Sequence, residues 1–162
     1  MNPLQHKTAA REFVARWQAA EGNEQREAQK FWIELLGEVL NVPQPTRLLD
    51  FERKVQGRRI DVFLEDIGVL IEHKSRGADL DKSYERGKDE GGAARMVTPF
   101  EQAKWYADNL PRTQSPRWLI VCNFDQIRMG HMLGEALLSR RSRSCEVEMW
   151  KQVTLPMLAR WI

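Results

Sequence analysis

The chain has little cysteine and no long apolar run, and each absence excludes a class of protein. Only two of its 162 residues are cysteines. Cys122 lies in an apolar stretch and Cys145 in a polar one, so we expect no disulfide framework and a reduced, cytoplasmic setting. No stretch approaches the roughly 20 apolar residues of a membrane span. The N-terminus also lacks the basic-then-apolar order of a secretory signal, so we expect no membrane partner.

The composition that is present describes one ordinary folded domain. Hydrophobic residues make up 42% of the chain and charged residues 30%, and this length supports a single core. We therefore expect one domain over residues 1–162. The net charge of +2 is only a weak hint of a nucleic-acid partner. Basic clusters at Arg58-Arg59, 82–88 and 140–143 could contact phosphates or form solvated faces.

Residues 60–74 are the most informative stretch. Val, Ile, Phe and Leu fill two runs on either side of a short polar segment. This pattern predicts two β-strands joined by a tight turn. Three charged residues, Asp61, Glu72 and Lys74, interrupt the apolar runs, where unpaired charge is normally excluded. They are the candidate functional residues.

Strand geometry brings these three side chains together. Successive side chains point to opposite faces of a strand, so Glu72 and Lys74 share a face. A turn centred on Asp66-Ile67 places Asp61 directly opposite Glu72, at a Cβ separation of roughly 4.5–5.5 Å. A shift of one residue would turn Asp61 to the other face, so the register of the hairpin tests this prediction.

Two neighbouring carboxylates in a half-buried sheet need positive charge, because burial and mutual repulsion both raise their pKa. Lys74 supplies one charge. Mg²⁺, or Mn²⁺ in its place, would supply more, because a hard cation takes carboxylate, water and phosphate oxygens as ligands. An ion and a lysine together can activate water and stabilise charge on a phosphate, which is the chemistry of phosphodiester hydrolysis. The alternative interpretation is an ordinary Glu72–Lys74 ion pair beside Asp61.

The rest of the chain predicts helices around this hairpin. Asn23 is a candidate helix cap, and Thr98 with Glu101 forms a capping box. The polar stretch 75–97 is expected to be a loop that faces DNA or gates the site, or a simple surface insertion. The expected fold class is α/β, a small mixed sheet of four or five strands flanked by helices. The remaining expected helices are residues 8–20, 23–40, 98–109 and 155–162, with a short helix or loop over 133–139, and the remaining strands are 48–55, 117–124, 126–132 and 145–150.

Asp61 and Glu72-His73-Lys74 resemble the PD-(D/E)xK motif of nucleases with the restriction-endonuclease-like fold, although Ile60 stands where the motif has proline. The wider chain, from about residue 12 onward, resembles the N-terminal nuclease domain of MmeI-like (type IIG/IIL) single-chain restriction-modification enzymes. The other matching segments are Gly22-Asn23-Glu24, residues 29–32, 102–106, 118–124 and 153–162.

The resemblance implies a metal-dependent endonuclease that acts on double-stranded DNA. By this resemblance, Asp61 and Glu72 would hold Mg²⁺ together with Glu24 and the main-chain carbonyl of His73. Lys74 would orient the attacking water and stabilise the phosphate. Gln102 and Tyr106 match a Q-x-x-x-Y motif and would position the DNA backbone.

The apolar tail at residues 159–162 leads us to expect that the polypeptide continues. The chain has neither the Gly-rich cofactor loop nor the Asn-Pro-Pro-aromatic motif of amino-methyltransferases. The resemblance therefore implies downstream methyltransferase and target-recognition domains as partners, with S-adenosylmethionine acting only through them. Two alternatives stay open: a stand-alone repair-type or structure-specific nuclease, and a non-catalytic nucleic-acid-binding domain.

Overall fold

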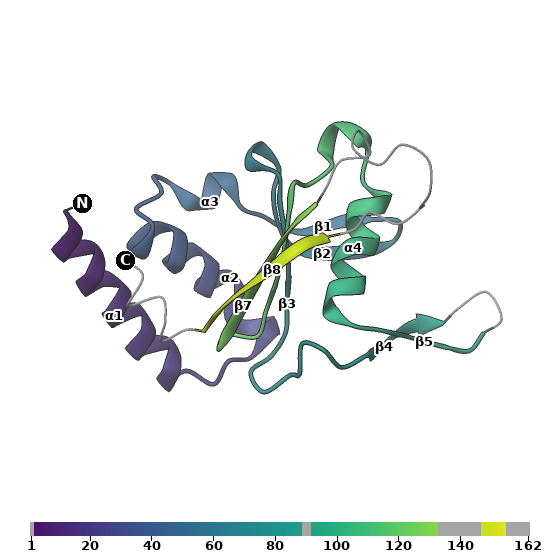
Figure 1. Cartoon of the computed structure of the whole chain (residues 1–162), viewed down its shortest axis with the longest axis horizontal. Coiled ribbons are helices and arrows are strands. Elements are labelled where there is room, and N and C mark those ends of the chain that lie inside the picture. Colours follow the sequence, from purple (N-terminus) through teal and green to yellow (C-terminus); the bar gives the residue numbers. More distant parts are fainter. Residues whose placement is uncertain (1, 89–91, 133–146, 155–162) are drawn as a thin grey trace.

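The computed structural model describes residues 2–88 and 92–132, and the backbone of residues 147–154. A mixed β-sheet runs through the centre of the domain (Figure 1). Helices α1 and α2 lie on one side of the sheet and helix α4 on the other. This arrangement confirms the predicted α/β class. No helix in the described ranges is both long enough and apolar enough to cross a membrane.

The central sheet has six strands in the order β1-β2-β3-β6-β7-β8. All neighbours are antiparallel except β3 and β6, which are parallel. The sheet is larger than the four or five strands expected, because β8 pairs with β7 and extends the far edge. The strands are Asp50–Val55 (β1), Arg58–Leu64 (β2), Val69–His73 (β3), Trp118–Cys122 (β6), Gln126–Met132 (β7) and Val147–Thr154 (β8).

The predicted register of the central hairpin is confirmed. Strands β2 and β3 pair so that Phe63 faces Leu70, as expected for a turn centred on residues 66–67. The turn is a short 3₁₀ segment, Glu65–Ile67, followed by Gly68 at φ +67°, a conformation that glycine adopts without strain. The hairpin therefore carries Asp61 to the level of Glu72.

One face of the sheet packs against an aromatic layer. Helix α1 (Pro3–Ala19) begins five residues earlier than predicted, because Asn2 forms a capping box with Gln5. Helix α2 (Glu24–Glu34) is capped by Asn23, as predicted, and continues into a π-helical turn at Leu35–Val39. A short helix, α3 (Pro45–Leu48), precedes β1. The aromatic layer consists of Phe13, Trp17, Phe31, Trp32 and Phe124.

Helix α4 (Pro99–Asn109) covers the opposite face. Its predicted capping box is present, because the Thr98 side chain accepts from the Glu101 N–H while the Glu101 carboxylate accepts from the Thr98 N–H. The buried residues of this face come mainly from α4 and from strands β2, β3 and β6, with Val55 of β1 and Leu80. They include Ile60, Phe63, Leu70, Ala103, Tyr106, Leu119 and Val121.

The prediction of a loop over residues 75–97 is wrong in part. Strands β4 (Tyr84–Lys88) and β5 (Ala94–Val97) form a separate two-stranded sheet that projects beside α4 (Figure 1). These strands are mostly exposed, so their sequence lacks the apolar alternation by which strands are recognised. The elements predicted at 133–139 and 155–162 lie outside the described residues, as does Cys145.

Candidate active site

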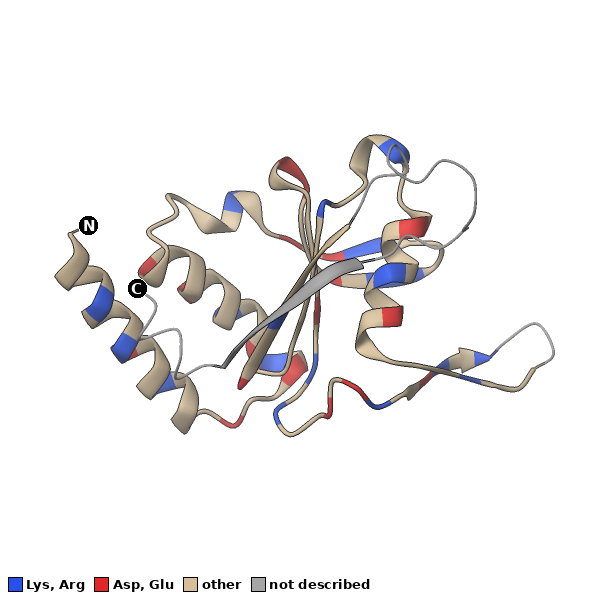
Figure 2. Cartoon of the chain, viewed as in Figure 1, with Lys and Arg blue, Asp and Glu red and all other residues tan. Residues whose placement is uncertain are grey.

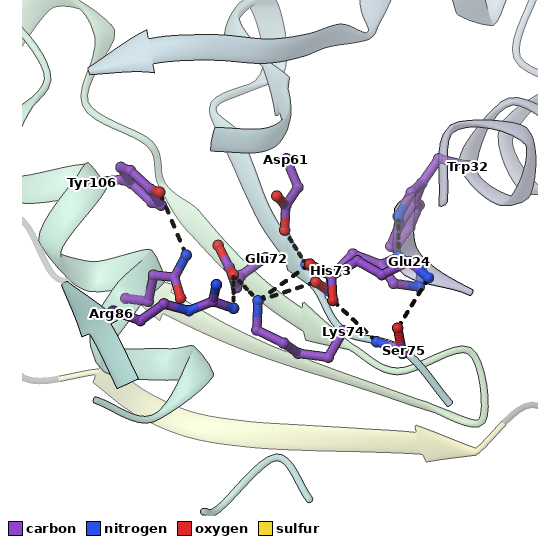
Figure 3. A network of polar contacts seen from close by, with 10 residues as sticks. Glu24, Trp32, Asp61, Glu72, His73, Lys74, Ser75, Arg86 and Tyr106 are labelled. Atoms are coloured by element: carbon purple, nitrogen blue, oxygen red, sulfur yellow. Dashed lines mark hydrogen bonds and ion pairs between the residues drawn. The ribbon is translucent and has the colours of Figure 1, made fainter. Parts of the chain in front are cut away.

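The candidate site lies where strand β3 ends. Glu72 is completely buried and Lys74 is only 4% exposed. The Lys74 ammonium donates to Glu72 Oε1 in a short ion-paired hydrogen bond, and also to the His73 carbonyl at 3.2 Å (Figure 3). The predicted shared face of Glu72 and Lys74 is thus confirmed. The His73 carbonyl also faces this cluster, as the resemblance implied.

Asp61 reaches the same place from strand β2. Its Oδ2 accepts a hydrogen bond from the His73 N–H at 2.8 Å, just past the last paired residues of the hairpin. Ile60 and Phe63 both pack on the α4 face although they are three positions apart, so the regular alternation of β2 is interrupted between them. Glu52, on the neighbouring strand, has φ +59° at this level. The Asp61 carboxylate lies at this irregular level of the sheet.

Glu24 joins the cluster from helix α2, as predicted. Its Oε1 lies 3.7 Å from Lys74 Nζ. Its Oε2 accepts from the Ser75 N–H at 3.2 Å, while Ser75 Oγ accepts from the Glu24 N–H at 3.1 Å. This reciprocal pair fixes the start of α2 to the chain that leaves β3. Ser75 was not predicted, because a serine in a polar stretch has no distinguishing signal.

Gln102 and Tyr106 approach the acids from helix α4. Gln102 Nε2 donates to the Tyr106 hydroxyl at 3.4 Å, and both side chains are largely buried. Burial, followed by the negative charge of Glu72, raises the pKa of Tyr106. The two residues line a hollow of about 390 Å³, and a third lining residue, Arg86, lies 4.0 Å from Glu72 Oε1, so we call it the hollow beside Glu72. The structure therefore brings all of the predicted site residues into one region.

The two acids of the hairpin are held where ionisation is unfavourable. Burial and, after it, the Asp61 charge raise the pKa of Glu72 to about 8 against the opposing effect of Lys74. Burial likewise raises the pKa of Asp61 to about 6 against the opposing effect of Lys74. Glu72 Oε2 is buried and has no hydrogen-bond partner among the described residues. Such an atom needs a proton or a further cation.

The donor atoms of these residues are of the kind that a hard cation takes, but the side chains are only partly arranged around one position. Carboxylate and carbonyl oxygens are the donors that Mg²⁺ takes in proteins, often only one or two carboxylates with water completing the shell. Asp61, Glu72 and the His73 carbonyl supply such oxygens. Across residues 2–88 and 92–132, however, no three His, Cys, Asp or Glu side chains are grouped as a metal site. In this arrangement the Lys74 ammonium is the cation between Glu72 and Glu24.

The His73 ring points to the other face of the sheet. Its Nδ1 accepts from the Trp32 indole N–H at 2.9 Å, and the ring packs against Phe31 and Phe124. Burial lowers the pKa of His73 to about 3, so the ring is neutral. His73 thus takes part in the site through its main chain only. The bond between Trp32 and His73 was not predicted.

The comparisons with known proteins agree with the resemblance noted from the motif. No curated protein and no solved structure matches the chain. The family model described as "MmeI, N-terminal domain" matches residues 7–158, a range that contains every residue of the candidate site. The chain therefore belongs to the family of MmeI N-terminal domains, modules of restriction-modification enzymes.

Proposed function

We propose that this domain is the Mg²⁺-dependent endonuclease module of a restriction-modification enzyme and hydrolyses phosphodiester bonds in double-stranded DNA. The family match supplies the restriction-modification context. One observation carries the proposal: Glu72 is a fully buried carboxylate with one oxygen that has no partner among the described residues, and it lies close to Asp61 and Lys74. A structural ion pair would not need the second acid.

Asp61 and Glu72 would hold the ion, with help from the His73 carbonyl and from Glu24. When bound, Mg²⁺ lowers the pKa of a water ligand and polarises a phosphoryl oxygen. Hydrogen bonds hold two of these carboxylates in position before any ion binds. The His73 N–H holds the Asp61 carboxylate at 2.8 Å, and Ser75 holds Glu24. This support reduces the loss of side-chain freedom on binding.

Lys74 would act on the nucleophile and on the phosphate. An ammonium has three donors and no acceptor, so it can orient an attacking water and stabilise the negative charge that develops on the phosphate oxygens. In the described structure it pairs with Glu72 and Glu24. With Glu72 and Glu24 holding the ion, the Lys74 ammonium would be available for this role.

Gln102 and Tyr106 would position the DNA backbone. Their amide and hydroxyl groups line the hollow beside Glu72 and can donate to phosphate oxygens. Phosphate contacts carry no sequence information, so we expect DNA binding that is sensitive to salt and indifferent to sequence. Sequence recognition would then depend on other parts of the restriction-modification enzyme.

The test combines metal uptake with DNA cleavage. Isothermal titration of the chain with Mg²⁺ and Mn²⁺ should show uptake that Asp61→Ala abolishes and Lys74→Ala retains. Nicking of supercoiled plasmid by the polypeptide that carries this domain should be lost in Asp61→Ala. In Lys74→Ala it should fall about a hundredfold or more, because a charge-stabilising donor is removed.

Asp66→Ala is the matched control, because this acid lies in the exposed turn at the other end of the same hairpin. It should change neither metal uptake nor nicking. Metal uptake that Asp61→Ala leaves intact would contradict the proposal and favour a structural charge cluster in a non-catalytic binding domain.

A further inference from the structure

The hollow beside Glu72 has a basic lining that the proposed catalytic residues do not explain. It is formed by the start of β2, by β4 and by α4. Two of its lining residues are arginines, Arg58 and Arg86, and one is an acid, Glu85, so the lining carries a net positive charge. Figure 2 marks further basic positions on the β4–β5 hairpin beside α4. An arrangement of guanidinium groups of this kind suits an anionic ligand.

Arg86 is directed toward the site by an irregularity in strand β4. Arg86 and Gly87 together lie opposite Arg95 alone, because the register of the β4–β5 pair shifts between residues 85 and 88. Such a bulge bends a strand and re-aims a side chain. Gly87 has φ +81°, which an L-residue adopts only with strain. The Arg86 guanidinium consequently lies 4.0 Å from Glu72 Oε1 (Figure 3).

Arg58 is held on the opposite wall by an aromatic ring. Its guanidinium lies 4.8 Å from the centroid of the Trp105 ring, and that of Arg95 lies 5.8 Å from the same ring. Stacking of this kind orients an arginine while its N–H donors stay available. Within the part of the chain that the structure describes, neither Arg58 nor Arg95 forms an ion pair with a carboxylate. Their charge is therefore available to a ligand.

We propose that this hollow binds a phosphate group of the DNA backbone and that Arg86 and Arg58 are its principal ligands. The guanidinium fork matches two phosphate oxygens, which makes arginine the strongest side chain for this contact. Arg86 can leave Glu72 for the phosphate without leaving that carboxylate unpaired, because Lys74 also pairs with Glu72. The inference rests on the proposed function, since it names the residues by which the same site holds its substrate.

The test measures DNA binding without cleavage. Fluorescence anisotropy of a short labelled duplex, with EDTA present, gives the affinity of the full chain over a range of salt concentrations. Arg86→Ala and Arg58→Ala should each weaken binding about tenfold, because each removes a charge-assisted contact. Each should also reduce the slope of log affinity against log salt by about 0.9, as expected for one lost phosphate contact.

Arg59→Ala is the matched control. Arg59 is the neighbour of Arg58 in the same strand and carries the same charge, but it is 61% exposed and lies 3.5 Å from Glu52. This variant should retain the affinity and the salt slope of the wild type. Circular dichroism of all variants confirms that they fold.

Gly87→Ala tests the bulge without changing any charge. Alanine at φ +81° strains the bulge, so Arg86 should be displaced and DNA affinity should fall by a smaller factor than in Arg86→Ala. Gly77→Ala is its control, since Gly77 also has φ +81° and an added Cβ would meet no atom within 4 Å. Gly77→Ala should leave DNA affinity unchanged.

The inference is overturned if Arg86→Ala and Arg58→Ala bind duplex as Arg59→Ala does, or if the wild type does not bind duplex. Uptake of inorganic phosphate without any binding of duplex would also overturn the assignment to DNA. The two proposals fail separately. Arginine-dependent binding by an enzyme that never cleaves refutes the nuclease and leaves the phosphate site, whereas cleavage with unaltered binding in the arginine variants refutes only the phosphate site.

Discussion

The two faces of strand β3 differ sharply although their residues alternate along a single strand. On the α1–α2 face, Ile71 and His73 are sealed within an aromatic layer, and the His73 ring is neutral. On the α4 face, Leu70 is followed by Glu72 and Lys74, which form a buried charged pair beside an open hollow. Both faces therefore supply packing energy, but only the α4 face also contains charged groups whose burial costs energy.

The comparison shows how the first face supports the second. The ring of His73 belongs to the aromatic layer, but its N–H binds Asp61 and its carbonyl accepts from Lys74. Trp32 fixes the ring, and therefore the strand, against helix α2. The same helix carries Glu24 at its first turn. Packing on one side thus sets the positions of the acids on the other.

The largest expected effect comes from removing the centre of the aromatic layer. Phe31 is fully buried and contacts four other aromatic side chains as well as His73. Phe31→Ala should lower the free energy of unfolding by about 3–5 kcal/mol, measured by urea denaturation. The exposed hairpin residue Ile67 is the control, and Ile67→Ala should change stability by less than about 0.5 kcal/mol. Equal losses in both variants would refute the central role of Phe31 in the aromatic layer.

The next largest effect concerns the charged face and depends on pH. The pKa of Glu72 rises from an ordinary 4.5 to about 8 in the folded protein. Between these pH values the folded protein binds more protons than the unfolded chain, so its stability falls as pH rises. Glu72→Gln should remove this fall in stability. At pH 8 the variant should have a free energy of unfolding about 2–4 kcal/mol higher than that of the wild type, since one pKa unit corresponds to about 1.4 kcal/mol.

The measurement is urea denaturation at intervals across this pH range. The difference between wild type and Glu72→Gln removes the contributions of groups distant from Glu72, because the opposite effects of Glu65 and Asp81, whose pKa values are lowered by arginine partners, cancel in it. Asp66→Asn, in the exposed turn, should reproduce the wild-type profile. A wild-type profile that rises between pH 5 and 8 relative to Glu72→Gln would contradict the prediction.

The smallest expected effect concerns the bond that connects the two faces. Trp32→Phe keeps an aromatic ring but removes the donor to His73 Nδ1. The other ring nitrogen of His73, Nε2, has no hydrogen bond among the described residues, so the variant leaves the buried ring without any. It should cost about 1–2 kcal/mol of stability, and it should weaken metal uptake because the main chain of His73 positions Asp61. Trp17→Phe is the control, since the Trp17 indole donates to the partly exposed Glu34, which water can satisfy. Equal behaviour of the two variants would show that the Trp32–His73 bond does not matter.

The hairpin and its acids were predictable because the governing signals are local. The two apolar runs and the polar turn set the register that places Asp61 level with Glu72, and the caps at Asn23 and Thr98 set where two helices begin. The β4–β5 hairpin was missed because its exposed strands have no such apolar runs, although Gly91-Gly92 between them is a turn signal.

By itself, the sequence determined which residues are chemically capable and which of them share a strand face, because both follow from residue type and a period of two. Only the tertiary structure decided which distant groups meet them. Trp32 reaches His73 across 41 positions, Ser75 binds Glu24 across 51, and Arg86 turns back toward Glu72 at a bulge. These contacts depend on how the helices and the second hairpin pack around the sheet, and packing is a property of the whole chain rather than of any local pattern.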